Sequence, residues 1–337
     1  MPPATSAAVT SAIRFIGIPP GFILTATIRD ALSASYRGQI NDFLPVVQGG
    51  RSGRQRDLLL GPVLDAVVVL PDEQQRAALL DAHEELVSLP CLPELGPSQL
   101  AGMEPGLQAP AGRAFFLEEF SVDARALMTA SLEAARSRRI QMLSGVAATG
   151  VEPAGGRTLQ VTTDRDRLQA PIVVNCAGAW AGQVPPHKFP TRPVKGQMLA
   201  VAAPEGLDLR HVVRAPSVYV VPRSDGRILI GATQEEAGFD RSVDPKAIER
   251  LHQAAAAIFP ALGSARVVET WSGLRPGTPD ALPILGPTPM PGYFVAAGHF
   301  RNGFLLAPLT AQAMAMVIRG SEPPVDITRF SPSRFER

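Results

Sequence analysis

The residues best suited to chemistry lie near the C-terminus, where a strand, a glycine turn and a helix start follow one another. The apolar run 293–297 predicts the strand, GHFRNG at 298–303 the turn, and an apolar helical run begins at Phe304. The first N–H groups of a helix are free to bind an anion or the polar edge of a ring, and a neighbouring glycine lets such a ligand approach the backbone closely. Arg275 and Arg301 are predicted on loops beside this turn, and arginine can grip a carboxylate with two hydrogen bonds. Most such turns bind nothing, so these residues alone leave a ligand site and a plain connection equally open.

The elements that must position these residues alternate between strands and helices. Two β-rich runs, 218–223 and 227–233, flank Ser224-Asp225-Gly226 and predict a hairpin, with Tyr219 and Val221 facing one way and Val218 and Val220 the other. Asp244-Pro245 caps a helix running to about Phe259. The Gly/Pro-rich segment 273–277 predicts a turn that fixes Arg275. The whole chain is predicted to be a two-domain α/β protein.

Composition narrows the class of protein and of partner. The chain has 337 residues, 45% of them hydrophobic and 19% charged, which is typical of a soluble globular protein. A net charge of +1 gives no reason to expect nucleic acid or an acidic membrane surface as partner. The sequence contains no run of 18 apolar residues, so no transmembrane helix is expected. Two cysteines cannot build a disulfide framework, so the cytoplasm is the expected compartment. No cluster has metal-ligand spacing, no catalytic triad is visible, and a monomer and a homo-oligomer both stay open.

Two long motifs connect this segment to a known family. GLRPGTPD at 273–280 and GHFRNGFLLAP at 298–308 resemble the C-terminal flavin-binding segment of the D-amino-acid oxidase superfamily, and most resemble its glycine oxidases of thiamin biosynthesis. The likeness covers roughly residues 60 to 330. It implies a discontinuous FAD-binding Rossmann-like domain, incomplete at the N-terminus, plus a substrate domain with a mainly antiparallel sheet. The expected substrate domain comprises 59–120 and 188–275, and the expected FAD-binding domain comprises 121–187 and 276–330.

The resemblance also assigns site residues. Positions matching Arg275 and Tyr219 hold the substrate carboxylate, while Arg301 borders the flavin and the substrate amine. No side chain is expected to act as a strong base, because the cofactor performs the difficult step. Gln234 stands where family members often have an apolar residue, so it is expected to affect substrate preference. The residues expected to bind FAD are Val146, Cys176, Ala177, Gly178, Trp180, Gly298, His299, Arg301, Asn302, Gly303, Phe304 and Leu305. Cys176 is interpreted as a small apolar residue of the interior, not as a nucleophile.

The N-terminus departs from the family. Its members open with a strand, GxGxxG and a helix that holds the FAD pyrophosphate, and this chain contains no GxGxxG. Residues 1–58 are therefore expected to be atypical, either poorly ordered or mistranslated. The resemblance implies oxidation of glycine, sarcosine or small D-amino acids, with FAD as cofactor and O2 reduced to H2O2. Two alternatives stay open: a D-amino-acid dehydrogenase with another electron acceptor, and an inactive truncated member that binds no FAD.

Overall fold

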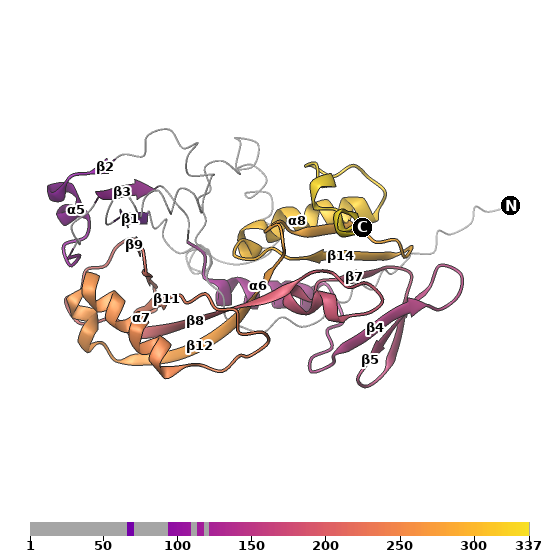
Figure 1. Cartoon of the computed structure of the whole chain (residues 1–337), viewed down its shortest axis with the longest axis horizontal. Helices are drawn as coiled ribbons and strands as arrows, with labels where there is room; N and C mark the ends of the chain where they lie inside the picture. Colours follow the sequence, from indigo (N-terminus) through magenta and orange to yellow (C-terminus); the bar gives the residue numbers. More distant parts are fainter. Residues whose placement is uncertain (1–65, 71–93, 109–112, 118–120, 337) are drawn as a thin grey trace.

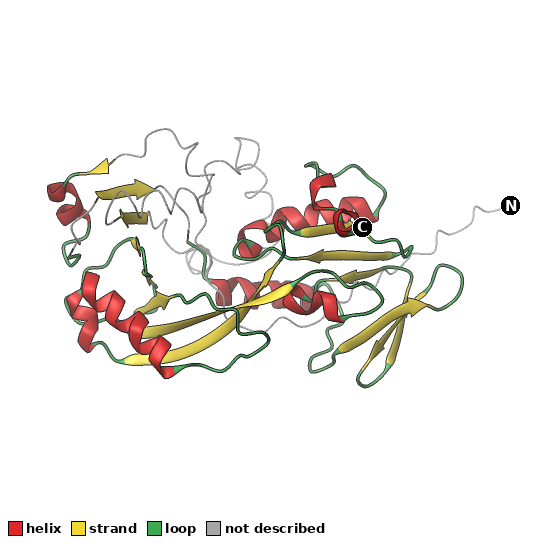
Figure 2. Ribbon diagram, viewed as in Figure 1, coloured by secondary structure: helices red, strands yellow, loops and turns green. Residues whose placement is uncertain are grey.

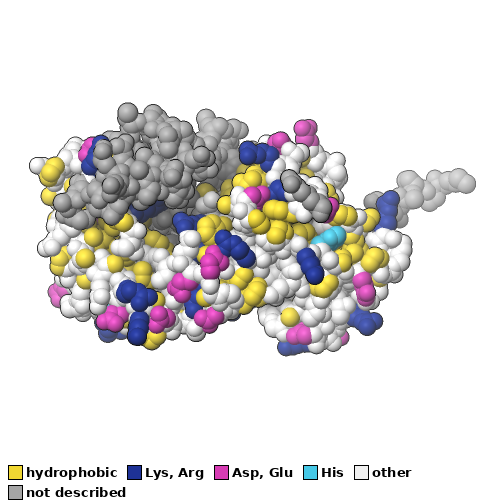
Figure 3. Space-filling model, viewed as in Figure 1, with side chains coloured by type: hydrophobic (Ala, Val, Ile, Leu, Met, Phe, Trp, Pro, Cys, Tyr) yellow, Lys and Arg dark blue, Asp and Glu magenta, His cyan; other side chains and the backbone are white. Residues whose placement is uncertain are grey.

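The computed structural model describes residues 66–70, 94–108, 113–117 and 121–336, which form one large sheet and two small ones (Figure 1). Residues 1–58, for which the sequence predicts an atypical segment, lie outside the described part. Of β1 (Ala66–Leu70) the structure defines the backbone alone. On the face seen in Figure 3, the described basic and acidic side chains are interspersed, in keeping with the small net charge.

The large sheet has eight strands in the order β12-β8-β11-β10-β9-β1-β3-β2. Neighbours pair antiparallel except β1 and β9, which are parallel, so the expectation of a mainly antiparallel sheet is confirmed. After β1, its strands are β2 (Glu94–Leu95), β3 (Arg113–Leu117), β8 (Arg192–Ala202), β9 (Val212–Ala215), β10 (Val218–Pro222), β11 (Arg227–Gly231) and β12 (Val267–Gly277).

The predicted hairpin is present as β10 and β11, and its two faces are the predicted ones. Tyr219 pairs with Gly231 across the ladder. Val218 and Val220 pack into the larger apolar core, while Tyr219 and Val221 belong to a separate cluster on the opposite face. The sheet therefore has a face that builds the core and a second face that holds Tyr219.

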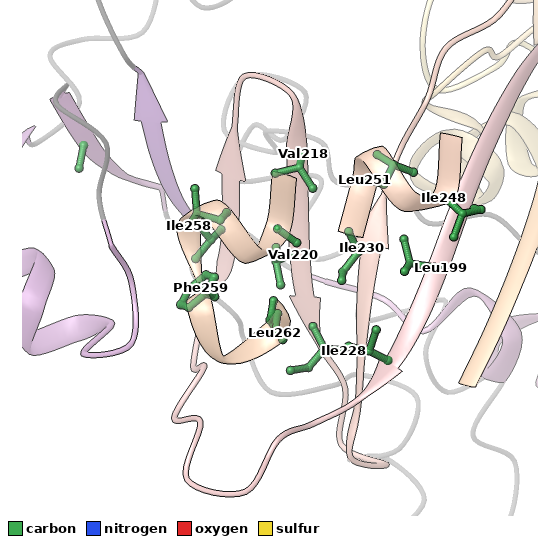
Figure 4. Packing of buried hydrophobic residues seen from close by; sticks show 14 of the residues in the cluster. Leu199, Val218, Val220, Ile228, Ile230, Ile248, Leu251, Ile258, Phe259 and Leu262 are labelled. Atoms are coloured by element: carbon green, nitrogen blue, oxygen red, sulfur yellow. The ribbon is translucent and has the colours of Figure 1, made fainter. Parts of the chain in front are cut away.

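Helix α7 (Pro245–Ile258) covers the core face of this sheet (Figure 4). Its start matches the sequence pattern: the Asp244 carboxylate accepts a hydrogen bond from the backbone N–H of Lys246 at 3.0 Å, and Pro245 opens the first turn. Ile248 and Leu251 point from the helix onto the strands. Each such side chain contributes about 1.5–3 kcal/mol by burial, so packing on this face stabilises the sheet.

The segment 273–277, predicted as a turn, is strand. It continues β12, and Arg275 pairs with Val194 of β8. The prediction was wrong because glycine and proline break central strands but are tolerated at a sheet edge, and β12 is an edge strand. Pro276 faces Pro193 in the same ladder. Arg275 is consequently fixed by a regular strand and not by a loop.

A second group of elements lies beyond the end of β12 (Figure 2). One three-stranded sheet has β14 in the middle, antiparallel to β13 and parallel to β7. The other has the order β4-β5-β6 and packs on Val184 and Tyr293. These strands are β4 (Ala148–Pro153), β5 (Leu159–Thr163), β6 (Arg167–Ala170), β7 (Val173–Asn175), β13 (Ile284–Pro287) and β14 (Tyr293–Ala297).

Helices flank both groups of sheets. In Figure 1, α8 lies along the β13–β14–β7 sheet and α6 lies between the two groups. The helices and 3-10 turns besides α7 are α5 (Pro97–Met103), α6 (Ala124–Ser137), α8 (Gly303–Ile318), η1 (Gly178–Gln183), η2 (Pro260–Ser264), η3 (Thr328–Phe330) and η4 (Pro332–Phe335). None of the helices in the described part of the chain is long and apolar enough to cross a membrane.

Candidate functional site

Two of the segments predicted to bind the cofactor meet at one edge of the three-stranded sheet, where the parallel strands β7 and β14 end. Val295 of β14 pairs with Asn175 of β7, so both strands end at the same edge. The small-residue turn Cys176-Ala177-Gly178 follows β7, and the turn that starts at Gly298 follows β14. In open α/β sheets, ligands bind outside the carboxyl ends of the strands. The fold thus brings together two segments that lie more than a hundred residues apart in the sequence.

The start of α8 is open toward this edge. Asn302 precedes the helix and its side chain makes no capping hydrogen bond, so the first-turn N–H groups at Gly303, Phe304 and Leu305 have no side-chain partner there. Arg301 and Asn302 are exposed and the three first-turn residues are half-buried. A helix start with free N–H groups suits an electron-rich ring edge. These residues fit the polar edge of a flavin.

His299 is neutral at this helix start. Its Nε2 atom lies 3.0 Å from Thr310 Oγ1, and burial lowers the pKa of its imidazole to about 4. A neutral ring adds no charge to the edge where the helix dipole is positive. His299 therefore supports the turn through α8 and leaves the electrostatics to the backbone and the arginines.

The turn between β14 and α8 is attached to the end of β12. The backbone N–H of Phe300 donates to the Pro276 carbonyl oxygen at 3.0 Å. Gly298 has a φ of +79°, and a Cβ there would lie 2.6 Å from Thr278 Cγ2, so this position requires glycine. This hydrogen bond places the turn that contains Arg301 next to the end of β12, the strand that carries Arg275.

Arg275 lies across the backbone of β8. A Cβ on Gly196 would stand 2.3 Å from Arg275 Nη1, so the guanidinium group occupies the space that the missing side chain leaves. Its Nη1 donates to the carbonyl oxygens of Thr233 at 3.1 Å and Lys195 at 3.4 Å. Burial, and to a smaller extent repulsion by Arg301, lowers the pKa of Arg275. The group remains a cation because the ordinary pKa of arginine is far above neutral pH.

The Tyr219 side chain likewise lies over a glycine of the neighbouring strand, Gly231. A Cβ on Gly231 would lie 2.7 Å from the Tyr219 hydroxyl and 2.7 Å from Met198 Cε. The hydroxyl points to Met198 Sδ at 3.5 Å, a weak acceptor. Burial raises the pKa of Tyr219 to about 12, which keeps the phenol protonated and able to donate at neutral pH. Since side chains alternate along strands, Tyr219 and Arg275 emerge on the same face of the sheet, opposite α7.

Arg301 is held by Gln234. Its Nη2 donates to the Gln234 side-chain oxygen, and its guanidinium carbon lies 5.2 Å from the Phe300 ring centroid. Gln234 follows Thr233 directly, so one dipeptide contacts Arg275 through a backbone carbonyl and Arg301 through a side chain. The three residues predicted to bind substrate are thus brought to one place by β10, β12 and this dipeptide.

A buried polar network fixes the Thr233–Gln234 dipeptide. Gln197, 0% exposed, donates from its backbone N–H to Thr233 Oγ1 at 2.9 Å and from Nε2 to Glu235 Oε1 at 2.8 Å. Its Oε1 accepts from the Asp244 N–H at 2.7 Å, which links the network to the start of α7. The buried Lys195 side chain forms an ion pair with Asp240, with Nζ 2.6 Å from Oδ2. The loop therefore has a defined position relative to the sheet.

The remaining predicted cofactor residues take up varied positions. Trp180 of η1 packs against Phe239, which belongs to the loop that contains Thr233 and Gln234, with ring centroids 5.4 Å apart. Cys176 is half-buried, and burial raises the pKa of its thiol to about 11, so it is no ready nucleophile. Val146 is half-buried and precedes β4. The binding roles assigned to all these residues stay predictions.

Sequence reasoning missed Gly196, Gly231 and Thr233. Glycine inside a predicted strand is itself a signal of close approach by another group, and Gly231 lay in a segment predicted to be β. Thr233 carried no such signal, because its carbonyl contact with Arg275 joins residues 42 positions apart. The search for metal sites found no cluster of His, Cys, Asp or Glu ligands in the described residues.

Comparison with known proteins agrees with this architecture. The bifunctional protein ThiO/ThiG of Synechocystis sp. is 39% identical over 222 residues, which are 65% of this chain and 34% of that protein. Glycine oxidase of Pseudomonas putida is 39% identical over 188 residues, 55% of this chain and 51% of that one. This chain thus matches about a third of the first relative's length and about half of the second's.

Solved structures give the same relationship over a longer span. The crystal structure of glycine oxidase from Geobacillus kaustophilus superposes with a TM-score of 0.78 and 30% identity, covering 93% of this chain and 85% of that one. The model of the FAD dependent oxidoreductase family matches residues 58–316. With most of its length matched by that model, the chain belongs to the family of FAD-dependent oxidoreductases typified by D-amino-acid oxidase.

Proposed function

We propose that this protein oxidises glycine or another small amino acid, such as sarcosine or a small D-amino acid, with FAD as cofactor and O2 as electron acceptor. One observation carries the proposal. Arg275 and Tyr219, two donors suited to a carboxylate, emerge on one sheet face, and the dipeptide that contacts Arg275 also holds Arg301 at the start of α8.

The proposed roles follow from the donors. The Arg275 guanidinium and the Tyr219 hydroxyl would bind the substrate carboxylate in a partly desolvated pocket, where charge-assisted hydrogen bonds are strong. The edge formed by the turns after β7 and β14 would hold the flavin, with the first-turn N–H groups of α8 toward its polar ring edge. FAD, when bound, takes two electrons and a proton from the substrate Cα–H bond and passes reducing equivalents to O2, giving H2O2.

The chain's own residues then have an orienting task. Holding the carboxylate at Arg275 would fix the substrate relative to the cofactor edge, and this positioning lowers the barrier without a protein base. The substrate amine would have to be neutral for oxidation, and repulsion from nearby Arg301 favours its neutral form. The imine product would be hydrolysed by water to the oxo acid and the free amine, which is ammonia from glycine and methylamine from sarcosine.

Glycine-dependent H2O2 formation by the FAD-loaded full-length chain tests the proposal. The expected result is peroxide in proportion to glycine consumed, and a much lower rate in Arg275→Met at glycine concentrations below saturation. If glycine reduces the bound flavin but oxygen uptake stays at background and an artificial quinone is reduced instead, the protein is a dehydrogenase. If no small amino acid reduces the flavin, the proposed activity is wrong.

A further inference from the structure

The two arginines at this site have no acidic partner among the described residues, whereas several other arginines do. Arg227 pairs with Asp225 at 2.7 Å, Arg125 with Glu269 at 2.6 Å and Arg334 with Asp280 at 2.7 Å. Arg275 donates to two backbone carbonyls, and Arg301 donates to the side-chain amide of Gln234. Within the described residues, neither Arg275 nor Arg301 forms an ion pair.

The carboxylates closest in sequence to this dipeptide are occupied elsewhere. Glu235 Oε1 accepts hydrogen bonds from Gln197 and Thr233, and Asp240 is paired with Lys195. Glu236 pairs with Arg192. The loop that carries three acidic residues thus directs each of them to a partner other than Arg275 and Arg301. Among the residues that the structure describes, no acidic side chain pairs with either of these two positive charges.

The two guanidinium groups lie close enough to interact, because repulsion by Arg301 contributes to the lowered pKa of Arg275. Their acceptors belong to consecutive residues, Thr233 and Gln234. Like charges this close repel, and they are stabilised when an anion binds between or across them. Arg275 is half-buried and Arg301 is exposed, so the pair runs from the interior of the site to its rim.

The charge balance identifies the kind of substrate. A glycine zwitterion adds no net charge, and its single carboxylate occupies one guanidinium group. A substrate with a second carboxylate would compensate both. Resting on the function proposed above, we propose that the preferred substrates are small amino acids with two carboxylates, the first bound by Arg275 and Tyr219 and the second by Arg301. Gln234 is then a specificity-determining residue, because a neutral acceptor orients Arg301 and leaves its charge for the ligand.

Iminodiacetate, which is glycine with a carboxymethyl group on its nitrogen, is the simplest such compound. Its oxidation balances as iminodiacetate plus O2 plus H2O giving glyoxylate, glycine and H2O2. One Cα–H bond and the N–H bond are lost to form the imine, and water then cleaves the C=N bond. D-aspartate carries the second carboxylate on carbon instead, so comparing the two locates the second anion relative to the amine.

Binding of redox-inert isosteres tests the inference independently of catalysis. Glutarate has the chain length of iminodiacetate, and pentanoate is its monoanionic counterpart. By calorimetry on the full-length chain supplied with FAD, we expect glutarate to bind at least about tenfold more tightly than pentanoate, since a charge-assisted hydrogen bond contributes on that scale. Arg301→Met and Gln234→Glu should both weaken glutarate binding more than pentanoate binding, and so remove the difference. Arg266→Met, at an exposed arginine just before β12, should leave the difference intact.

Three results would overturn the inference: equal affinities for the two anions, no binding of either, or an equal loss for both in Arg301→Met. Thermal unfolding of each variant shows whether the fold is kept. Because Gln234 is exposed, Gln234→Glu alone decides the matter if Arg301→Met is unstable.

Steady-state oxidation separates this inference from the proposed function. Iminodiacetate should exceed N-ethylglycine in kcat/KM by about tenfold or more. Oxidation without that preference refutes the dicarboxylate inference alone, whereas tight glutarate binding without any oxidation refutes the proposed activity alone.

Discussion

The Arg275 guanidinium group occupies the place where a side chain on Gly196 would be, with Nη1 only 2.3 Å from the ideal Cβ position. The two residues lie on neighbouring strands, β12 and β8, and point to the sheet face opposite α7. A regular strand pair with one missing side chain therefore defines the position of the principal carboxylate donor.

Gly196→Ala should weaken substrate binding with little loss of stability. The three atoms nearest to the added methyl group all belong to the flexible end of the Arg275 side chain, so Arg275 would move and the sheet would stay intact. We expect KM for the amino acid to rise by about tenfold, the scale of one weakened charge-assisted bond. Gly150→Ala is the matched control, because Gly150 is also in a strand and has no atom within 4 Å of its Cβ position. Equal KM values for the two variants would contradict this role of Gly196.

Arg275→Ala should raise KM by about 10- to 100-fold through loss of the carboxylate partner, while bound FAD is retained. Arg275 contacts Thr233 and Lys195 and lies outside the edge assigned to the flavin. Flavin absorbance after gel filtration measures retention, and initial rates give KM. Release of FAD by this variant would show that Arg275 supports the fold and not the substrate.

His299 should make the fold less stable in mild acid. Burial lowers its pKa to about 4 from an ordinary value near 6.5, so the unfolded chain binds the proton first as pH falls. The contribution is fully present above pH 6.5 and is lost progressively as pH falls toward 4. Between pH 7.5 and 5, the free energy of unfolding should decrease by about 2 kcal/mol more in the wild type than in His299→Gln, which has no titrating ring. Urea unfolding at both pH values measures the difference, and parallel pH dependence in the two proteins would rule out this role.

Thr233→Val should disturb the site from a distance. The substitution keeps the side-chain shape but leaves the Gln197 N–H without its acceptor and removes a donor to Glu235. An unsatisfied buried N–H costs about 1–3 kcal/mol, and a looser loop would position Gln234 and Arg301 less well. We expect a lower unfolding temperature together with a higher KM, and addition of substrate should recover part of the lost stability. An unchanged KM would mean that the network supports the loop without affecting the site.

Local patterns predicted well what depends on neighbouring residues. The alternation of Val218, Tyr219, Val220 and Val221 gave the two faces of β10, and Asp244-Pro245 gave the start of α7. The segment 273–277 was misjudged because glycine and proline indicate a turn unless an edge strand accommodates them, and edge position depends on the whole sheet. The contacts of Arg275 with Thr233 and of Arg301 with Gln234 join residues 42 and 67 positions apart. No local rule predicts such pairs, although the resemblance to glycine oxidases had already marked both arginines.

The flavin site can be tested by the visible absorption spectrum of the purified full-length chain, recorded with added FAD and then with glycine in the absence of oxygen. We expect protein-bound bands near ~450 and ~370 nm, the absorption of the oxidised cofactor itself, followed by bleaching with glycine and recovery on admitting air. A chain that stays colourless after removal of free FAD would contradict the assignment of a flavin site to the turns after β7 and β14.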